Sequence, residues 1–182
     1  MSRPVKVRRP AAAPRRSIEI ANRHPQLKLD RRALKRAIHL LDEKFGEVSA
    51  TAQTVANARV CPPGELSLVF LTDAALAQLH ADFLDDPSAT DVITFEGDAA
   101  LGLAGEVCVS VDTARGYANA HQRDFATELT LYVVHGWLHL AGFDDLLPGK
   151  KRVMRRAEAR ALRLLQENAA RPKFSWRKGI SS

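Results

Sequence analysis

The sequence of 182 residues has only two cysteines, Cys61 and Cys108, and their separation fits neither a disulfide framework nor a cysteine metal site. This scarcity suits a protein of the reducing cytoplasm. No apolar run approaches the ~20 residues that span a membrane, and an apolar core for a secretory signal is lacking, as is any internal repeat. With 46% hydrophobic and 26% charged residues, the chain is expected to be a soluble, cytoplasmic, globular protein of one domain that is not bound to a membrane.

Acidic residues are scarce at both ends of the chain, and basic residues are scarce in its middle. Residues 1–36 hold 12 Lys and Arg against 2 acids, and residues 149–182 hold 11 against 2. Residues 37–148 hold 4 against 17, so the net charge of +6 conceals an acidic middle between basic ends. This distribution fits a protein that grips a polyanion beside a metal site. Solubilising tails would give the same pattern, and a basic stretch does not by itself choose among RNA, DNA and anionic lipid.

The two terminal segments differ in composition from the rest. Residues 1–16 contain three prolines and no acid, which predicts a disordered basic arm. An organelle transit peptide is the alternative, but the prolines would break the amphipathic helix that such a peptide needs. Residues 168–182 form a basic C-terminal tail that contains Phe174 and Trp176. These two aromatics could stack on single-stranded bases, or they could dock the tail onto the domain.

The segment Phe125–Leu140 is too apolar for a surface helix, and it ends in two histidines. In a helix, His135 and His139 lie about one turn apart, roughly 6 Å along the axis, so both imidazoles leave the same face. Two histidines at this spacing can hold one metal ion through their ring nitrogens. The alternative is that both merely pack within the helix, but burying two imidazoles in so apolar a segment is costly unless something binds them.

The residues after this helix supply a turn and a carboxylate. Gly142 can take the left-handed conformation that ends a helix, and Asp144 and Asp145 follow where a returning carboxylate could reach the same ion. The pattern H-x3-H-x2-G-x2-D gives three protein ligands with room for a water, which is typical of a catalytic zinc site. The aspartates could instead cap the helix end. Gly136 stands where helical metalloproteases carry a glutamate base, which counts against peptide hydrolysis.

The stretch HGWLHLAGFDD, residues 135–145, resembles the HGxLHLxGYDH signature of the YbeY-type bacterial endoribonucleases, which are ribosomal RNA maturation factors. Residues 89–95 resemble their TDVLSF strand, and residues 105–110 resemble their GDIxIS strand. Glu128, ahead of the first histidine, also fits. The resemblance extends roughly from Ile18 to Leu165, with the histidine motif as its most specific part.

This resemblance implies one Zn²⁺ or other divalent transition metal per chain, held by His135, His139 and Asp145. Two departures from the family pattern stand out. Asp145 replaces the third metal-binding histidine, and a carboxylate makes the site one unit less positive, so that the metal is a weaker Lewis acid. Leu84 aligns with an arginine of the family, and leucine cannot replace arginine as a phosphate clamp.

The function that the resemblance implies is a metal-dependent, single-strand-specific endoribonuclease in ribosomal RNA maturation, with RNA and the ribosome or its proteins as partners. Leu84 and Asp145 favour an alternative, a catalytically weak RNA-binding ribosome-assembly factor with a retained metal site. A small hydrolase is disfavoured by the missing glutamate, and a ferrous oxygenase fits the ligand count without any sign of a co-substrate site. The sequence does not identify a general base. Arg115 or Arg123 could take the role lost at Leu84.

Strand and helix patterns alternate irregularly along the chain, which predicts α+β or α/β architecture. The resemblance implies the first: a small mixed β-sheet of about four or five strands packed with about five helices, the metal-bearing helix being central. Residues 17–167 are expected to form this single metal-binding, catalytic-type domain. Helices are expected from Asp30 to Phe45, Asp73 to Leu84, Asp112 to His121, Asp124 to Leu140 and Pro148 to Glu167. The residues expected to face the core include Leu76, Leu79, Phe83, Val153, Met154 and Ala157.

Overall fold

A computed structural model of the chain describes residues 15–46, 60–84 and 90–177. Nearly all of the predicted basic arm 1–16 lies outside the described residues, and so does the side chain of Leu84. Where the described chain begins, Arg16 forms an ion pair with Asp42, the Nε–Oδ2 distance being 2.7 Å. This pair ties the start of the first strand to the first helix.

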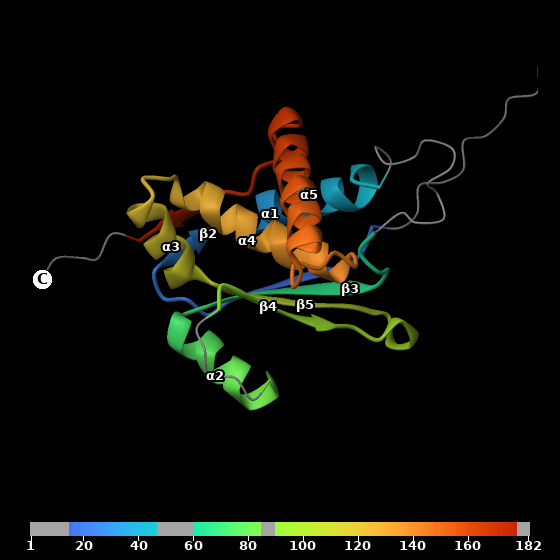
Figure 1. Ribbon diagram of the computed structural model, residues 1–182, viewed down its shortest axis with the longest axis horizontal. Helices are drawn as coiled ribbons and strands as arrows, with labels where there is room; N and C mark the ends of the chain where they lie inside the picture. The colour runs from blue at the N-terminus through green and yellow to red at the C-terminus, as the bar shows by residue number, and fades with distance from the viewer. Residues whose placement is uncertain (1–14, 47–59, 85–89, 178–182) are drawn as a thin grey trace, which may run out of the picture.

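A mixed four-stranded sheet lies at the centre of the fold (Figure 1). In order across the sheet, its strands are β1 (Ile18–Asn22), β3 (Glu65–Leu71), β5 (Leu103–Ser110) and β4 (Val92–Glu96). The first three are parallel, while β4 at the edge runs antiparallel to β5, to which it is joined through the 3-10 turn η3 (Ala99–Leu101). The last four residues of β3 and of β5 are buried on both faces, as is typical of parallel strands covered by helices.

In the described part of the chain, five α-helices cover the sheet unequally, and they complete the predicted α+β fold. One face is covered by α2 (Asp73–Leu84), and the other carries α1 (Arg31–Lys44), α4 (Phe125–Leu140) and α5 (Pro148–Glu167), with α3 (Val111–Ala120) beside α4 (Figure 1). Helix α4 is central, because it contacts α3, α5, β4 and β5. Among the described residues, none of the helices combines the length and the apolar character that crossing a membrane requires.

Helix α4 begins and ends as its sequence predicts. The Asp124 carboxylate accepts hydrogen bonds from the backbone N–H and the hydroxyl of Thr127, both at 2.8 Å, and so caps the first turn. At the other end, Gly142 has a φ of +84°, and the backbone N–H of Phe143 donates to the Leu138 carbonyl at 3.0 Å. This left-handed turn reverses the chain, so the residues after α4 return toward its last turn.

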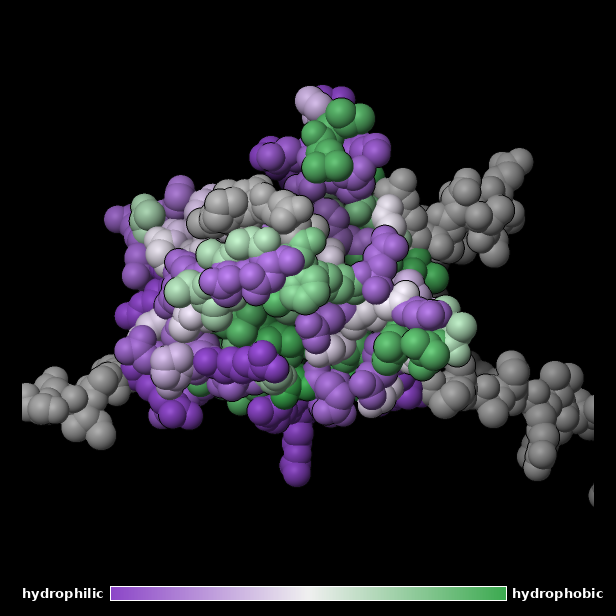
Figure 2. Space-filling model, turned by 90° about the horizontal axis from the view of Figure 1, so that it is seen from below, coloured by the Kyte–Doolittle hydropathy of each residue, from purple (hydrophilic) through white to green (hydrophobic). Residues whose placement is uncertain are grey.

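Two apolar residues predicted to face the core are exposed, and both predictions are wrong. Phe83 of α2 is 66% exposed, because among the described residues α2 is the single helix on its face of the sheet, and the Phe83 ring packs edge-on against Phe95 of the edge strand β4. This is the face seen in Figure 2, on which apolar side chains reach the surface between polar ones. Val153 of α5 is 45% exposed, because the buried stripe of that helix is centred on its neighbour Met154, about 100° around the axis.

The two aromatics of the C-terminal segment dock onto the domain. Strand β6 (Phe174–Trp176) pairs antiparallel with β2 (Leu27–Leu29), and Phe174 is buried. The guanidinium of Arg115 stacks over the Trp176 ring, 3.8 Å from its centroid. Of the two uses considered for these aromatics, the structure shows docking. Arg115 is engaged in the same cluster.

Candidate metal centre

The turn at the end of α4 brings the three predicted metal ligands together. The Nε2 atoms of His135 and His139 are 2.9 Å apart. The carboxylate oxygens of Asp145 lie 3.7 Å from His139 Nε2 and 4.0 Å from His135 Nε2. One donor atom from each residue lies within 4.8 Å of the other two. The three side chains are 18%, 27% and 31% exposed, so the cluster is open to solvent on one side.

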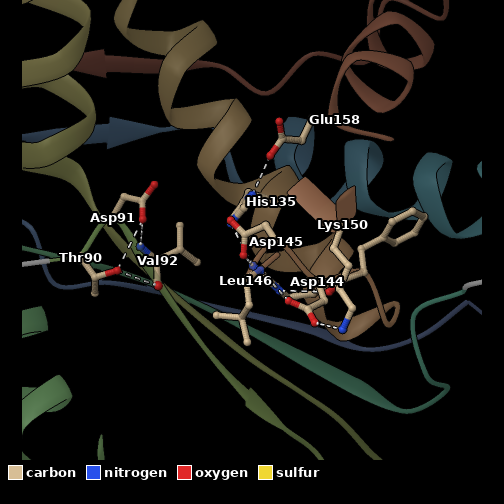
Figure 3. A network of polar contacts seen from close by, with 11 residues as sticks. Thr90, Asp91, Val92, His135, Asp144, Asp145, Leu146, Lys150 and Glu158 are labelled. Atoms are coloured by element: carbon tan, nitrogen blue, oxygen red, sulfur yellow. Dashed lines mark hydrogen bonds and ion pairs between the residues drawn. The ribbon is translucent and has the colours of Figure 1, made fainter. Parts of the chain in front are cut away.

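Hydrogen bonds at the Nδ1 atoms fix the orientation of both imidazoles. The Glu158 carboxylate lies 2.7 Å from His135 Nδ1, and the Phe143 carbonyl lies 3.1 Å from His139 Nδ1 (Figure 3). Carbonyl and carboxylate oxygens are acceptors, so in the neutral imidazoles both protons are assigned to Nδ1. The Nε2 atoms then carry lone pairs, and these lone pairs face each other.

The donor set of this cluster fits a divalent transition metal. Two lone pairs 2.9 Å apart repel unless a proton or a cation lies between them. Tetrahedral zinc with bonds of about 2.0–2.1 Å places its ligand atoms roughly 3.3 Å from one another, a value that the observed separations of 2.9, 3.7 and 4.0 Å bracket. Two imidazole nitrogens and one carboxylate leave a coordination position open. The cluster can therefore bind a metal ion in a catalytic type of geometry.

The surroundings shift the pKa values of the two imidazoles in opposite directions. Burial alone would lower the pKa of His135, but the hydrogen bond and the negative charge of Glu158, supported by Asp91 and Asp145, raise it above its ordinary value. Burial lowers the pKa of His139, and the positive charge of His135 lowers it further. Of the two imidazoles His135 is therefore the more basic, and a metal would compete with protons for both.

Glu158 is the functional residue that the sequence reading missed. It lies 23 residues beyond His135 on a different helix, so no local spacing connects the two. One signal was present: Glu158 is the single acid among the many basic residues of 149–166. Because α5 crosses α4 at this point, an isolated carboxylate on its inner face reaches the imidazole.

Replacing Glu158 with alanine is expected to weaken metal binding about 10–100-fold, because the His135 imidazole loses the partner that orients it and makes it a stronger donor. Glu158→Gln, which keeps an acceptor without the charge, is expected to lie between that variant and the wild type. Metal affinity is measured by competition with a chromophoric chelator. Glu167→Gln, at the exposed end of the same helix, is the matched control. Equal affinities for Glu158→Ala and the wild type would contradict an orienting role.

Asp144 has a different task from the one considered for it in the sequence. Its carboxylate accepts from the backbone N–H of Leu146 at 2.8 Å and from the Lys150 ammonium at 2.6 Å (Figure 3). It therefore holds the loop that leads into α5, and it is not one of the three residues that converge in the cluster.

A cleft of about 460 Å³ opens beside His135 and Asp145. Asp91, from the segment before β4, lies across this cleft from the histidine and accepts a hydrogen bond from the Val92 backbone N–H at 3.0 Å (Figure 3). The cleft walls also carry Tyr117, Glu128, Leu131, Tyr132, Lys151, Met154, Arg155 and Glu158.

Arg115 and Arg123 were considered as replacements for the arginine lost at Leu84, and the structure places them differently relative to the cleft. Arg115 lies over Trp176, away from the cleft lining. Arg123 pairs with Glu128 at 3.5 Å, and Glu128 is a 4% exposed residue of the cleft wall. Arg123 therefore reaches one end of the cleft, where its charge is already used by a buried carboxylate.

Known proteins that are similar to this chain share one family description. The family model described as endoribonuclease YbeY matches residues 19–166. The chain is 32% identical over 120 residues to an endoribonuclease YbeY from Parabacteroides distasonis, covering 66% of this chain and 84% of that protein. It is 37% identical over 133 residues to one from Protochlamydia amoebophila, covering 71% and 89%. A solution structure of a Thermotoga maritima protein, 20% identical, shares the fold with a TM-score of 0.53 over 84% of this chain and 92% of that one. With a family model that spans most of its length, this chain belongs to the YbeY endoribonuclease family.

Proposed function

We propose that this protein is a metal-dependent, single-strand-specific endoribonuclease that acts in ribosomal RNA maturation in the cytoplasm. One observation carries the proposal: His135, His139 and Asp145 converge beside an open cleft, in a chain whose relatives are named endoribonucleases. The substrate is a single-stranded segment of ribosomal RNA, and the ribosome or its proteins are the expected partners.

The residues of the site divide the work of hydrolysis among them. His135, His139 and Asp145 hold one Zn²⁺ or other divalent transition metal, and such an ion supplies Lewis-acid stabilisation of the charge that develops on the phosphate. Glu158 and the Phe143 carbonyl keep both imidazoles in the tautomer that presents Nε2. The partly exposed cluster leaves room for a phosphate and a water on its open side.

The proposal is tested by incubating the purified, metal-quantified full chain with a single-stranded RNA and with the same sequence as a duplex. Cleavage of the single strand is expected, with little cleavage of the duplex. His139→Ala, prepared in parallel, is expected to lose cleavage because it lacks one of three ligands, and this variant controls for a contaminating nuclease. A chelator should stop the wild-type reaction, and added metal should restore it. Intact RNA after incubation with the fully metal-loaded protein would instead indicate an RNA-binding assembly factor.

A further inference from the structure

Helix α5 turns one face toward the cleft, and two basic residues lie on that face. Lys151, Arg155 and Glu158 all line the cleft, at spacings of three and four residues that keep side chains on one side of a helix. Glu158 touches His135. Arg155 therefore lies about 4.5 Å, and Lys151 about 10 Å, further along the helix axis from the contact with the metal cluster.

These two cations are unengaged, unlike their neighbours in the chain. Both are exposed, and within the described ranges neither takes part in an ion pair. Lys150, the residue before Lys151, is bound to Asp144 at 2.6 Å. At the other end of the cleft, Arg123 is paired with Glu128. Lys151 and Arg155 are thus the cleft-lining cations free to meet an anion.

The cleft lining is rich in negative charge, so cations in it would favour the entry of a polyanion such as RNA. The lining contains four carboxylates, which belong to Asp91, Glu128, Asp145 and Glu158. These carboxylates repel a phosphate in the partly desolvated space where charges are poorly screened. Lys151 and Arg155 line the same cleft, and their positive charges offset that repulsion.

We propose that Arg155 and Lys151 form a phosphate clamp for the RNA strand, with Arg155 on the phosphate nearest the metal cluster and Lys151 on the next one. This inference rests on the proposed function and names the residues that hold its substrate. Arg155 supplies a planar fork that can bind two phosphate oxygens together, whereas Lys151 acts as a point charge. The clamp replaces, from another helix, the arginine that the family pattern places where this chain has Leu84.

The clamp is tested with two double variants of the full chain that have the same net charge. Arg155→Gln/Lys151→Gln removes the clamp, and Arg152→Gln/Arg156→Gln removes two exposed arginines of the same helix that lie outside the cleft lining. Binding of a fluorescent single-stranded RNA is followed by anisotropy across a salt series, and single-turnover cleavage is measured on the same RNA. The clamp variant is expected to bind about 10-fold more weakly for each lost charged contact. Its log–log salt slope should be shallower by about 1.4 for two phosphates.

The matched control is expected to change affinity and salt slope much less, and to cleave at close to the wild-type rate. Arg155→Lys should bind nearly as well as the wild type but cleave more slowly, because it keeps the charge and loses the two-point contact. Equal binding and cleavage by the two double variants would overturn the clamp, and so would a wild type that binds no RNA. A wild type that binds RNA through these two residues but never cleaves it would overturn the proposed function and leave the clamp standing.

Discussion

Alanine at position 136 is expected to destabilise the protein by about 2 kcal/mol, although alanine is the better helix former. Gly136 lies in α4 against the sheet, where an added Cβ would overlap Cγ1 of Val107 on β5 and lie 3.0 Å from Cγ1 of Val92 on β4. Ordinary carbon contacts need about 3.5–4.0 Å. Valine has few rotamers, and Val107 is fully buried, so the Val107 side chain cannot simply turn away. The helix must therefore move off the sheet, a cost that exceeds the ~1 kcal/mol gained in helix propensity.

The same substitution at a second helical glycine should have the opposite sign. Gly116 is exposed in α3, and nothing lies within 4 Å of its added Cβ, so Gly116→Ala is expected to stabilise by about 0.5–1 kcal/mol. Denaturant unfolding of both variants measures the contrast. Adding Val107→Ala to Gly136→Ala should recover part of the loss, because it removes the overlapping methyl groups. Wild-type stability for Gly136→Ala would show that the helix is not held this close to the sheet.

The contact at Gly136 also explains why this site lacks a residue that other helical metal enzymes use. Position 136 faces the sheet, whereas His135 faces the cleft and His139 lies beside it in the metal cluster. A glutamate here would point into Val107 and Val92, away from any bound substrate. The sequence argument against peptide hydrolysis, which used only the identity of residue 136, thus has a packing reason. A displaced helix in Gly136→Ala should accordingly weaken metal binding as well.

The parts of the fold that could be predicted from the sequence are those decided by local chemistry. The cap at Asp124, the turn at Gly142 and the shared face of His135 and His139 all depend on residues within a few positions of one another. The return of Asp145 to the same cluster follows from that turn, since the left-handed glycine reverses the chain.

The parts that could not be predicted depend on contacts between distant segments. Glu158 reaches His135 only because α5 crosses α4, and Trp176 docks only because β6 pairs with β2. Phe83 was misplaced for the same reason: helical spacing puts it on the apolar face of α2, but spacing does not say how far the covered sheet extends. Local periodicity gives the direction of a side chain, and the neighbouring element decides what it meets.

Removal of the Asp145 carboxylate is expected to have the largest effect on metal binding, about 100-fold or more. Loss of one of three donors should exceed the 10–100-fold cost of losing a partner that only orients a ligand. Asp145→Ala is compared with Asp144→Ala, since the adjacent carboxylate binds Lys150 and should be dispensable for the metal. Metal content per chain is measured after competition with a chromophoric chelator. Full occupancy in Asp145→Ala would exclude Asp145 as the third ligand.

Asp145→His restores the residue of the family pattern. It tests the charge of the site independently of the number of metal-donor atoms. It keeps a third donor and makes the site one unit more positive, so metal affinity should be retained and Lewis acidity should rise. Cleavage per metal-loaded molecule is then expected to increase. If affinity is kept but cleavage does not increase, Asp145 is not what limits the rate. We would then infer that the rate is limited by the proposed phosphate contacts of Lys151 and Arg155, which take the place of the arginine missing at Leu84.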